Sequence, residues 1–304
     1  MNHILSAAQF DRARIEDILH DAKEMEEVVR KGGDDRLKGK VLATLFYEPS
    51  TRTRLSHEAA MLRLGGQVVS QESASVSSSA TKGETIEDTI RIVEGYADVI
   101  VLRHPEMGAA ARAAAVASVP IINAGDGPGE HPTQSLLDLY TIEKEVGKID
   151  GVSIAFVGDL KYGRTVRSLA RILANFSRVR VTFVSPLSLG IGEDIKRILK
   201  EKGVSYRETE KLEEVLDAVD ILYMTRIQQE RFADRAEYER LKDSYILTNE
   251  MVQHMKSHAR ILHPLPRVHE IAPDVDQDPR AAYFRQAHNG LVVRMALLQK
   301  LLIK

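Results

Sequence analysis

The chain has 304 residues, of which 43% are hydrophobic and 28% are charged, and its formal net charge is −2. These values are typical of a globular protein long enough for two domains of about 150 residues each. The absence of cysteine excludes disulfides, thiolate metal sites and cysteine nucleophiles. The near-neutral charge argues against nucleic-acid binding, and the longest apolar runs are too short to cross a membrane. Because the N-terminal region carries charge where a signal peptide would be apolar, we expect a cytoplasmic protein.

Short apolar runs recur along the chain between segments with helical spacing. Runs of this length and spacing are typical of buried parallel strands in βαβ units. The expected strands are residues 41–46, 99–102, 121–124, 152–157, 180–184, 221–224 and 259–262. The pattern runs once before residues 147–151 and once after them, with a junction near a helix over 133–146. We therefore predict an α/β fold of two doubly wound domains, each with a central parallel sheet flanked by helices.

The first expected strand is followed by Ser-Thr-Arg-Thr-Arg at positions 50–54, which opens a helical segment. Backbone N–H groups at a helix N-terminus, the hydroxyls of Ser50, Thr51 and Thr53, and the guanidinium of Arg52 could all converge on one oxyanion. A phosphate fits this cradle. The alternative is that Ser50 or Thr51 only caps the helix while the arginines are solvated.

Five further strands are followed by loops that carry arginine, histidine or Gly/Pro-rich turns. These loops are residues 103–105, 125–134, 158–165, 225–228 and 263–267. In open parallel sheets, ligands bind at the carboxyl ends of the strands. Any one loop could be an ordinary solvated turn, but the same polarity at six strand ends predicts an active site in a cleft between the two domains.

Four arginines lie in these loops: Arg52, Arg103, Arg164 and Arg226. Arginine matches the two oxygens of a carboxylate or phosphate in a bidentate way, so the site favours polyanionic ligands. The sequence contains no HExxH motif, no P-loop and no carboxylate cluster at metal-ligand spacing. We therefore expect neither a metal nor a cofactor.

His131 and Gln134 lie three residues apart at the start of the helix over 133–146. This spacing places them on one helix face, where both could hydrogen-bond a single carbonyl oxygen of a ligand. The alternative is that they cap or pack beside Pro132. The other polar loops favour the electrophilic pair.

The segment 73–83 is rich in serine and ends in Lys82-Gly83. Its small polar residues are typical of a linker or mobile loop. Lys82 could instead bring a cation to an anionic ligand, although composition alone favours the linker.

Six motifs taken in order resemble the aspartate carbamoyltransferase family. They are Phe46 to Arg54, Arg103-His104-Pro105, His131-Pro132-Thr133-Gln134, Gly158 to Thr165, Met224 to Gln228 and His263 to Arg267. The resemblance spans nearly the whole chain. It implies transfer of the carbamoyl group from carbamoyl phosphate to L-aspartate, in pyrimidine synthesis, with a carbamoyl-phosphate domain over 1–133, an aspartate domain over 134–286 and a C-terminal helix, 287–304, that packs on the first domain.

The resemblance also assigns roles to residues. Carbamoyl phosphate would be bound by Ser50, Thr51, Arg52, Thr53, Arg103, His131, Gln134, Leu265 and Pro266. Aspartate would be bound by Ser78, Lys82, Arg164, Arg226 and Gln228. The implied catalytic residues are Arg52, Thr53, Lys82, Arg103, His131 and Gln134. Because Ser78 and Lys82 reach a neighbouring subunit's site in this family, the resemblance implies a homotrimer with shared active sites.

Two alternatives stay open at this point. The sister ornithine carbamoyltransferases share the phosphate loop, but their final loop resembles HCLP, whereas this chain has His263-Pro264-Leu265-Pro266. A polyanion-binding regulatory module would explain the arginines but not the pair of His131 and Gln134. The segment 161–166 is similar to that of catalytic subunits that assemble with separate regulatory chains, so such a partner is a further expectation.

Overall fold

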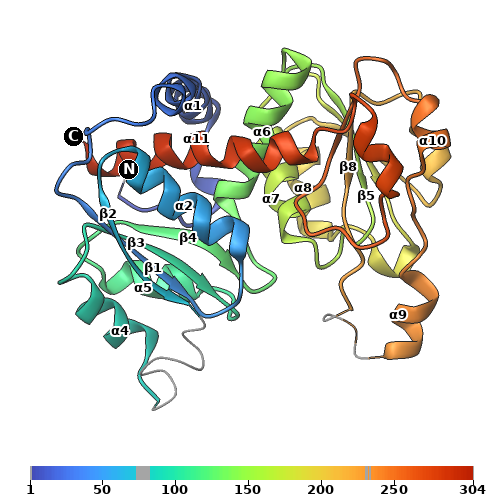
Figure 1. The fold of residues 1–304 in the computed structure, drawn as a ribbon. Helices are drawn as coiled ribbons and strands as arrows, with labels where there is room; N and C mark the ends of the chain where they lie inside the picture. The colour runs from blue at the N-terminus through green and yellow to red at the C-terminus, as the bar shows by residue number, and fades with distance from the viewer. Residues whose placement is uncertain (1, 73–82, 230–231, 233, 304) are drawn as a thin grey trace. The chain divides into compact units, whose positions relative to one another are not determined.

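The computed structural model describes residues 2–72, 83–229, 232 and 234–303, and Ser78 and Lys82 lie outside these ranges. The chain divides into two compact units (Figure 1). Unit 1 comprises Met1–Leu137 and His288–Lys304, and unit 2 comprises Asp138–Ala287. The boundaries expected after residues 133 and 286 lie four residues and one residue before the observed divisions. Within the described ranges, no helix is long and apolar enough to cross a membrane.

Unit 1 contains a parallel sheet with the strand order β2-β1-β3-β4. Its strands are β1 (Val41–Phe46), β2 (Gln67–Glu72), β3 (Val99–His104) and β4 (Ile121–Asp126). Its helices are α1 (Arg12–Arg30), α2 (Thr51–Arg63), α4 (Ile86–Val93), α5 (Ala109–Val116) and the C-terminal part of α11 (Tyr283–Leu302). Helices α4 and α5 cover one face of the sheet, and α2 lies on the other face (Figure 1).

The core of unit 1 forms because strand and helix side chains meet on the face covered by α4 and α5. Ile86 and Ile90 of α4 pack against Leu45 and Leu102 of the sheet, and all four are buried. Helix α4 begins where the Thr85 hydroxyl accepts a hydrogen bond from a backbone N–H of the first turn, at 3.1 Å. This is the arrangement expected of an N-cap threonine.

Unit 2 contains a second parallel sheet, with the order β7-β6-β5-β8-β9. Its strands are β5 (Ser153–Val157), β6 (Arg180–Val184), β7 (Ser205–Thr209), β8 (Ile221–Met224) and β9 (Arg260–Leu262). Its helices are α7 (Arg164–Leu173), α8 (Glu193–Glu201), α9 (Arg235–Leu241) and α10 (Asn249–Gln253), together with most of α6 (Pro132–Val146). The predicted fold class is therefore confirmed: two parallel sheets, each flanked by helices.

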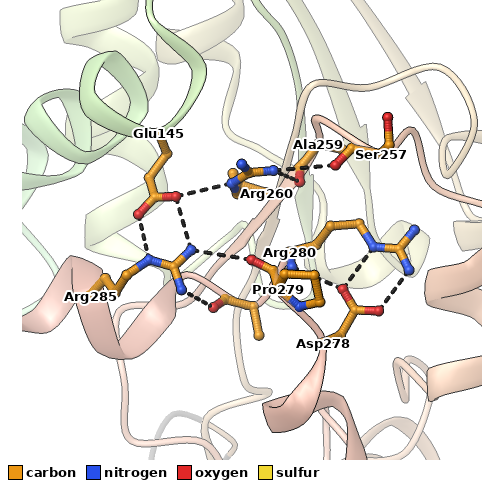
Figure 2. A network of polar contacts seen from close by, with 9 residues as sticks. Glu145, Ser257, Ala259, Arg260, Asp278, Pro279, Arg280 and Arg285 are labelled. Atoms are coloured by element: carbon orange, nitrogen blue, oxygen red, sulfur yellow. Dashed lines mark hydrogen bonds and ion pairs between the residues drawn. The ribbon is translucent and has the colours of Figure 1, made fainter.

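A carboxylate on α6 ties the C-terminal part of unit 2 together (Figure 2). Glu145 accepts hydrogen bonds from Arg260 Nε at 3.0 Å and from Arg285 Nε and Nη2 at 2.6 and 2.9 Å. Burial alone would raise the pKa of Glu145, but the two guanidinium groups outweigh burial and hold that pKa below its ordinary value of 4.5. Glu145 thus stabilises the folded unit in its ionised form.

We expect Glu145→Gln to lower the free energy of unfolding by about 2 kcal/mol at neutral pH, since charged hydrogen bonds are lost. The folded-state pKa of Glu145 lies below its ordinary value of 4.5. The stabilisation is therefore complete at a pH above 4.5, and it is lost as the pH falls through the folded-state pKa. Urea unfolding followed by circular dichroism, at neutral pH and in acid, measures both effects. Glu201→Gln, which alters an exposed ion pair with Arg197 on α8, is the matched control. Equal stability of the two variants at neutral pH would contradict the expectation.

Candidate active site

Three of the predicted polar loops lie at one edge of the sheet of unit 1. In the parallel register, Phe46 at the end of β1 pairs with Arg103 of β3, and His104 pairs with Asp126 at the end of β4. The three strands therefore end together. The loops that begin at residues 47, 105 and 127 leave the same carboxyl edge, as the sequence predicts.

The predicted anion cradle is the N-terminus of α2. Ser50 is the N-cap residue, and its carbonyl accepts from Arg54 N at 3.0 Å, yet its side chain makes no capping hydrogen bond among the described residues. The capping alternative is therefore not realised by Ser50. Thr53 is buried, whereas Arg52 is exposed. By helix geometry, the N–H groups of the first turn face the N-terminal end, where an anion binds favourably.

Arg54, the second arginine of this loop, has a structural role. Its Nη2 lies 3.0 Å from Glu72 Oε2 on the edge strand β2, and its Nη1 donates to Ser70 Oγ at 3.3 Å. These contacts bind α2 to its neighbouring strand. Because the Arg54 guanidinium is engaged by β2, we assign Arg52, not Arg54, to the ligand.

Arg103 is held between the end of β4 and the phosphate loop. Its Nη1 donates to Ala124 O at 3.3 Å, and its Nε lies 3.6 Å from Glu48 Oε2. Glu48 precedes Ser50 by two residues. The structure thus brings the cation of Arg103 to the loop that carries Ser50, as the predicted site requires.

The loop between β4 and α6 is organised by a buried carboxylate that the sequence analysis did not single out. Asp126 Oδ1 accepts from Asn123 Nδ2 at 3.1 Å and from Glu130 N at 3.0 Å, and its Oδ2 accepts from Gly108 N at 2.9 Å. These bonds fix both ends of the loop. The available sequence signal was a Gly-Asp-Gly sequence directly after the apolar run over 121–124.

His131 and Gln134 stand at the start of α6, which begins at Pro132. Proline is well suited to a first helical position because its missing N–H has no partner to lose there. Gln134 N and Ser135 N donate to His131 O at 3.0 and 3.2 Å, so His131 immediately precedes the helix. Both side chains are buried, at 4% and 9% exposure. The structure thus places both residues, buried, directly after the loop and at the start of α6.

Three predicted loops also share one edge of the sheet of unit 2. Val157 at the end of β5 pairs with Met224 at the end of β8, and Tyr223 pairs with Leu262 at the end of β9. The loops after these strands carry the predicted residues Arg164, Arg226, Gln228, Leu265 and Pro266. Arg164 is the first residue of α7, while Arg226 and Gln228 follow β8.

Asp159 links two of these loops. Its carboxylate accepts from Tyr162 N at 3.0 Å and from Gln228 Nε2 at 3.4 Å. Burial raises the pKa of Asp159 despite these hydrogen bonds. The adjacent Gly158 has φ +114°, and a Cβ there would lie 2.3 Å from Thr225 O, so only glycine fits. The two loops can therefore approach closely, with Gln228 oriented by Asp159.

The turn after β9 is held by a buried histidine. Leu265 N donates to His263 Nδ1 at 2.8 Å, so the proton of the neutral ring lies on Nε2, which donates to Glu270 at 2.8 Å. Burial would raise the pKa of Glu270, but the interaction with His263 and the hydrogen bonds from backbone N–H groups together outweigh burial and lower this pKa. Leu265, which precedes Pro266, has φ +49°, a left-handed conformation that a leucine adopts only when its surroundings impose it.

Fold and site together define a class: an α/β protein whose two parallel sheets each present cationic loops suited to an anionic substrate. Family models place it more narrowly. Residues 2–144 match the carbamoyl-phosphate-binding domain of the aspartate/ornithine carbamoyltransferases, and residues 150–301 match the Asp/Orn-binding domain.

Curated relatives and solved structures agree. The chain is 55% identical to an aspartate carbamoyltransferase of Arabidopsis thaliana over 100% of its own length and 78% of that protein. The catalytic subunit of M. jannaschii aspartate transcarbamoylase has a TM-score of 0.93 at 53% identity. The match covers 99% of this chain and 98% of that one. The structure of the Trypanosoma cruzi enzyme in complex with carbamoyl phosphate and aspartate has a TM-score of 0.94 at 42% identity. The match covers 99% of this chain and 97% of that one. The chain belongs to the aspartate/ornithine carbamoyltransferase family, and it is an enzyme of the aspartate branch.

Proposed function

We propose that the chain transfers the carbamoyl group from carbamoyl phosphate to the amine of L-aspartate, giving N-carbamoyl-L-aspartate and phosphate, in the synthesis of pyrimidines (UMP). One observation carries this proposal: the loops of Ser50, Arg103 and His131 share the carboxyl edge of the sheet of unit 1, and the loops of Arg164, Arg226 and Leu265 share the carboxyl edge of the sheet of unit 2. The family models assign those two segments to the two substrates.

In unit 1, the helix N-terminus at Ser50, Thr51, Arg52 and Thr53 would bind the phosphate group. Arg103, held beside this loop by Glu48, would bridge the phosphate and the carbonyl oxygen. His131 and Gln134 would then polarise the carbamoyl carbonyl. The support is the shared strand edge and the loop in front of His131, which the buried Asp126 organises.

In unit 2, Arg164 and Arg226 would each bind one carboxylate of aspartate. Gln228, oriented by Asp159, would assist them. The Leu265 carbonyl, in the turn shaped by Pro266, would accept from the carbamoyl amide. Ser78 and Lys82 of a neighbouring subunit would complete the aspartate site.

The chemistry needs positioning and charge. The amine of aspartate attacks the carbamoyl carbon, a C–N bond forms, and the C–O bond to phosphate breaks. Negative charge grows first on the carbamoyl oxygen and then on the departing phosphate, where His131, Arg52 and Arg103 would stabilise it. Holding two mutually repelling anions in reactive contact supplies much of the remaining acceleration.

The test is turnover of carbamoyl phosphate with L-aspartate or with L-ornithine at matched concentrations. Arg226 favours a carboxylate and repels the side-chain ammonium of ornithine, so we expect product with aspartate alone. Product with ornithine would move the chain to the sister branch. Binding of both substrates without product would support the polyanion-binding module instead.

We further propose that three chains assemble into a homotrimer. Unit 1 exposes apolar side chains where a neighbour could cover them: Leu55 and Leu62, seven residues apart on α2, at 49% and 59%, and Val69 on the edge strand β2 at 47%. An exposed apolar face of this kind would become an association surface if the side chains form one contiguous patch in the assembly. Light scattering that gives the mass of a single chain would contradict the proposal. Assembly with regulatory chains and a cytoplasmic location remain predictions.

A further inference from the structure

A run of buried hydrogen bonds crosses unit 2 and is centred on Asp138 of α6, one helical turn after Gln134. Tyr223 OH donates to Asp138 Oδ2 at 2.8 Å, and Gln286 Nε2 donates to Oδ1 at 2.6 Å. The Oε1 of Gln286 in turn accepts from His263 N at 2.8 Å. The side chains of Asp138, Tyr223 and Gln286 are all fully buried. The carboxylate therefore joins strand β8, helix α6 and helix α11.

One end of this run reaches the turn assigned to carbamoyl phosphate. Gln286 holds the backbone of His263, whose ring holds Leu265 N. Leu265 has a left-handed φ, which surrounding contacts must maintain. Loss of the Gln286 contact would free the segment that carries this residue.

The other end reaches the loops assigned to aspartate. Tyr223 lies in β8, three residues before Arg226, which follows this strand. The Tyr223 hydroxyl also interacts with Thr165, the neighbour of Arg164. Burial, together with the Asp138 carboxylate, raises the pKa of Tyr223 well above its usual value, so the phenol stays protonated and remains a donor. The strand that leads to Arg226 and the helix that starts with Arg164 thus share one buried hydroxyl.

A buried carboxylate is costly unless it is fully hydrogen-bonded, and well-packed apolar residues in its place are often neutral or stabilising. Stability alone therefore gives a weak reason for this arrangement. We propose that Asp138, with Tyr223 and Gln286, is a positioning network that sets the spacing between the aspartate-binding arginines and the Leu265 turn. The proposal rests on the proposed function and adds residues that touch neither substrate.

Two variants test the two ends, with a matched control. Tyr223→Phe removes one buried hydroxyl, and we expect it to raise the KM for aspartate about tenfold, because small misplacements of binding groups are costly. Gln286→Met removes both hydrogen bonds of Gln286 at similar volume, and we expect a comparable rise in the KM for carbamoyl phosphate. Tyr245→Phe removes another buried hydroxyl of unit 2, which donates to Glu210 O at 3.0 Å. This control should lower the melting temperature without changing either KM.

The inference is overturned if Tyr223→Phe and Gln286→Met lower the melting temperature while both KM values stay at those of the wild type. If Tyr223→Phe does not fold, Gln286→Met alone decides by the same criterion. Turnover of the wild type with aspartate, measured beside the variants, distinguishes failure of the proposed function from failure of the positioning network. Its absence would overturn the proposed function, whereas its presence with unchanged variants overturns only the positioning network.

Discussion

Arg52→Ala is expected to lower kcat/KM for carbamoyl phosphate by about 10²-fold to 10³-fold, the effect typical of removing one preorganised group that stabilises transition-state charge. Arg52 lies in the first turn of α2, where its guanidinium can add two parallel N–H donors to those of the helix N-terminus. Arg52→Lys keeps the positive charge but loses the bidentate guanidinium. Its kcat/KM should therefore lie between those of the wild type and the alanine variant. Initial rates over a range of carbamoyl phosphate concentrations measure the change.

The matched control is Arg91→Ala on α4. Arg91 is 59% exposed and pairs only loosely with Asp88 across one helical turn, at 3.3 Å. Its removal changes the net charge as Arg52→Ala does, yet it should leave the kinetics unchanged. Wild-type kinetics for Arg52→Ala would show that the N-terminus of α2 is not the phosphate site.

Arg226→Ala is expected to raise the KM for aspartate about 10²-fold, equivalent to roughly 3 kcal/mol, the usual cost of removing one partner from a desolvated charge pair. The KM for carbamoyl phosphate should change little, because Arg226 follows β8 in unit 2 and is assigned to a carboxylate of aspartate. Steady-state kinetics with each substrate varied in turn separate the two constants.

Arg197→Ala on α8 is the control for this variant, since the Arg197 side chain is 72% exposed and its ion pair with Glu201 is long, at 4.0 Å. Equal rises in both KM values for Arg226→Ala would indicate a general disturbance of unit 2. An unchanged KM for aspartate would remove Arg226 from the site.

The sequence predicted the inner strands well because they are buried on both faces. The apolar run over 180–184, for example, is strand β6 at the same bounds. Strands β2 and β7 were missed, and both are edge strands of their sheets with mostly exposed side chains. An edge strand open to solvent needs no apolar run, so Gln67–Glu72 and Ser205–Thr209 give no strand signal in the sequence.

The site loops were also predictable, since each directly follows a buried strand. The residues that hold these loops were not. Gln286 and Asp138 are 148 positions apart, and each stands in a helix where a polar residue ordinarily indicates an exposed face. Glu270 likewise acts through His263, seven residues earlier, by a contact that only the folded turn creates. The local sequence pattern therefore predicted the residues assigned to the ligands. The residues that hold those loops in place could not be predicted, because their contacts depend on tertiary packing.

The most direct test of the central claim is formation of the carbon–nitrogen bond. The enzyme would be given carbamoyl phosphate labelled with ¹³C and L-aspartate labelled with ¹⁵N, and the product would be followed by NMR. We predict a product carbon that shows one-bond coupling to ¹⁵N, formed together with phosphate, and formed about 10²-fold to 10³-fold more slowly by Arg52→Ala. Release of phosphate with all the ¹³C in species that lack this coupling would contradict carbamoyl transfer to aspartate.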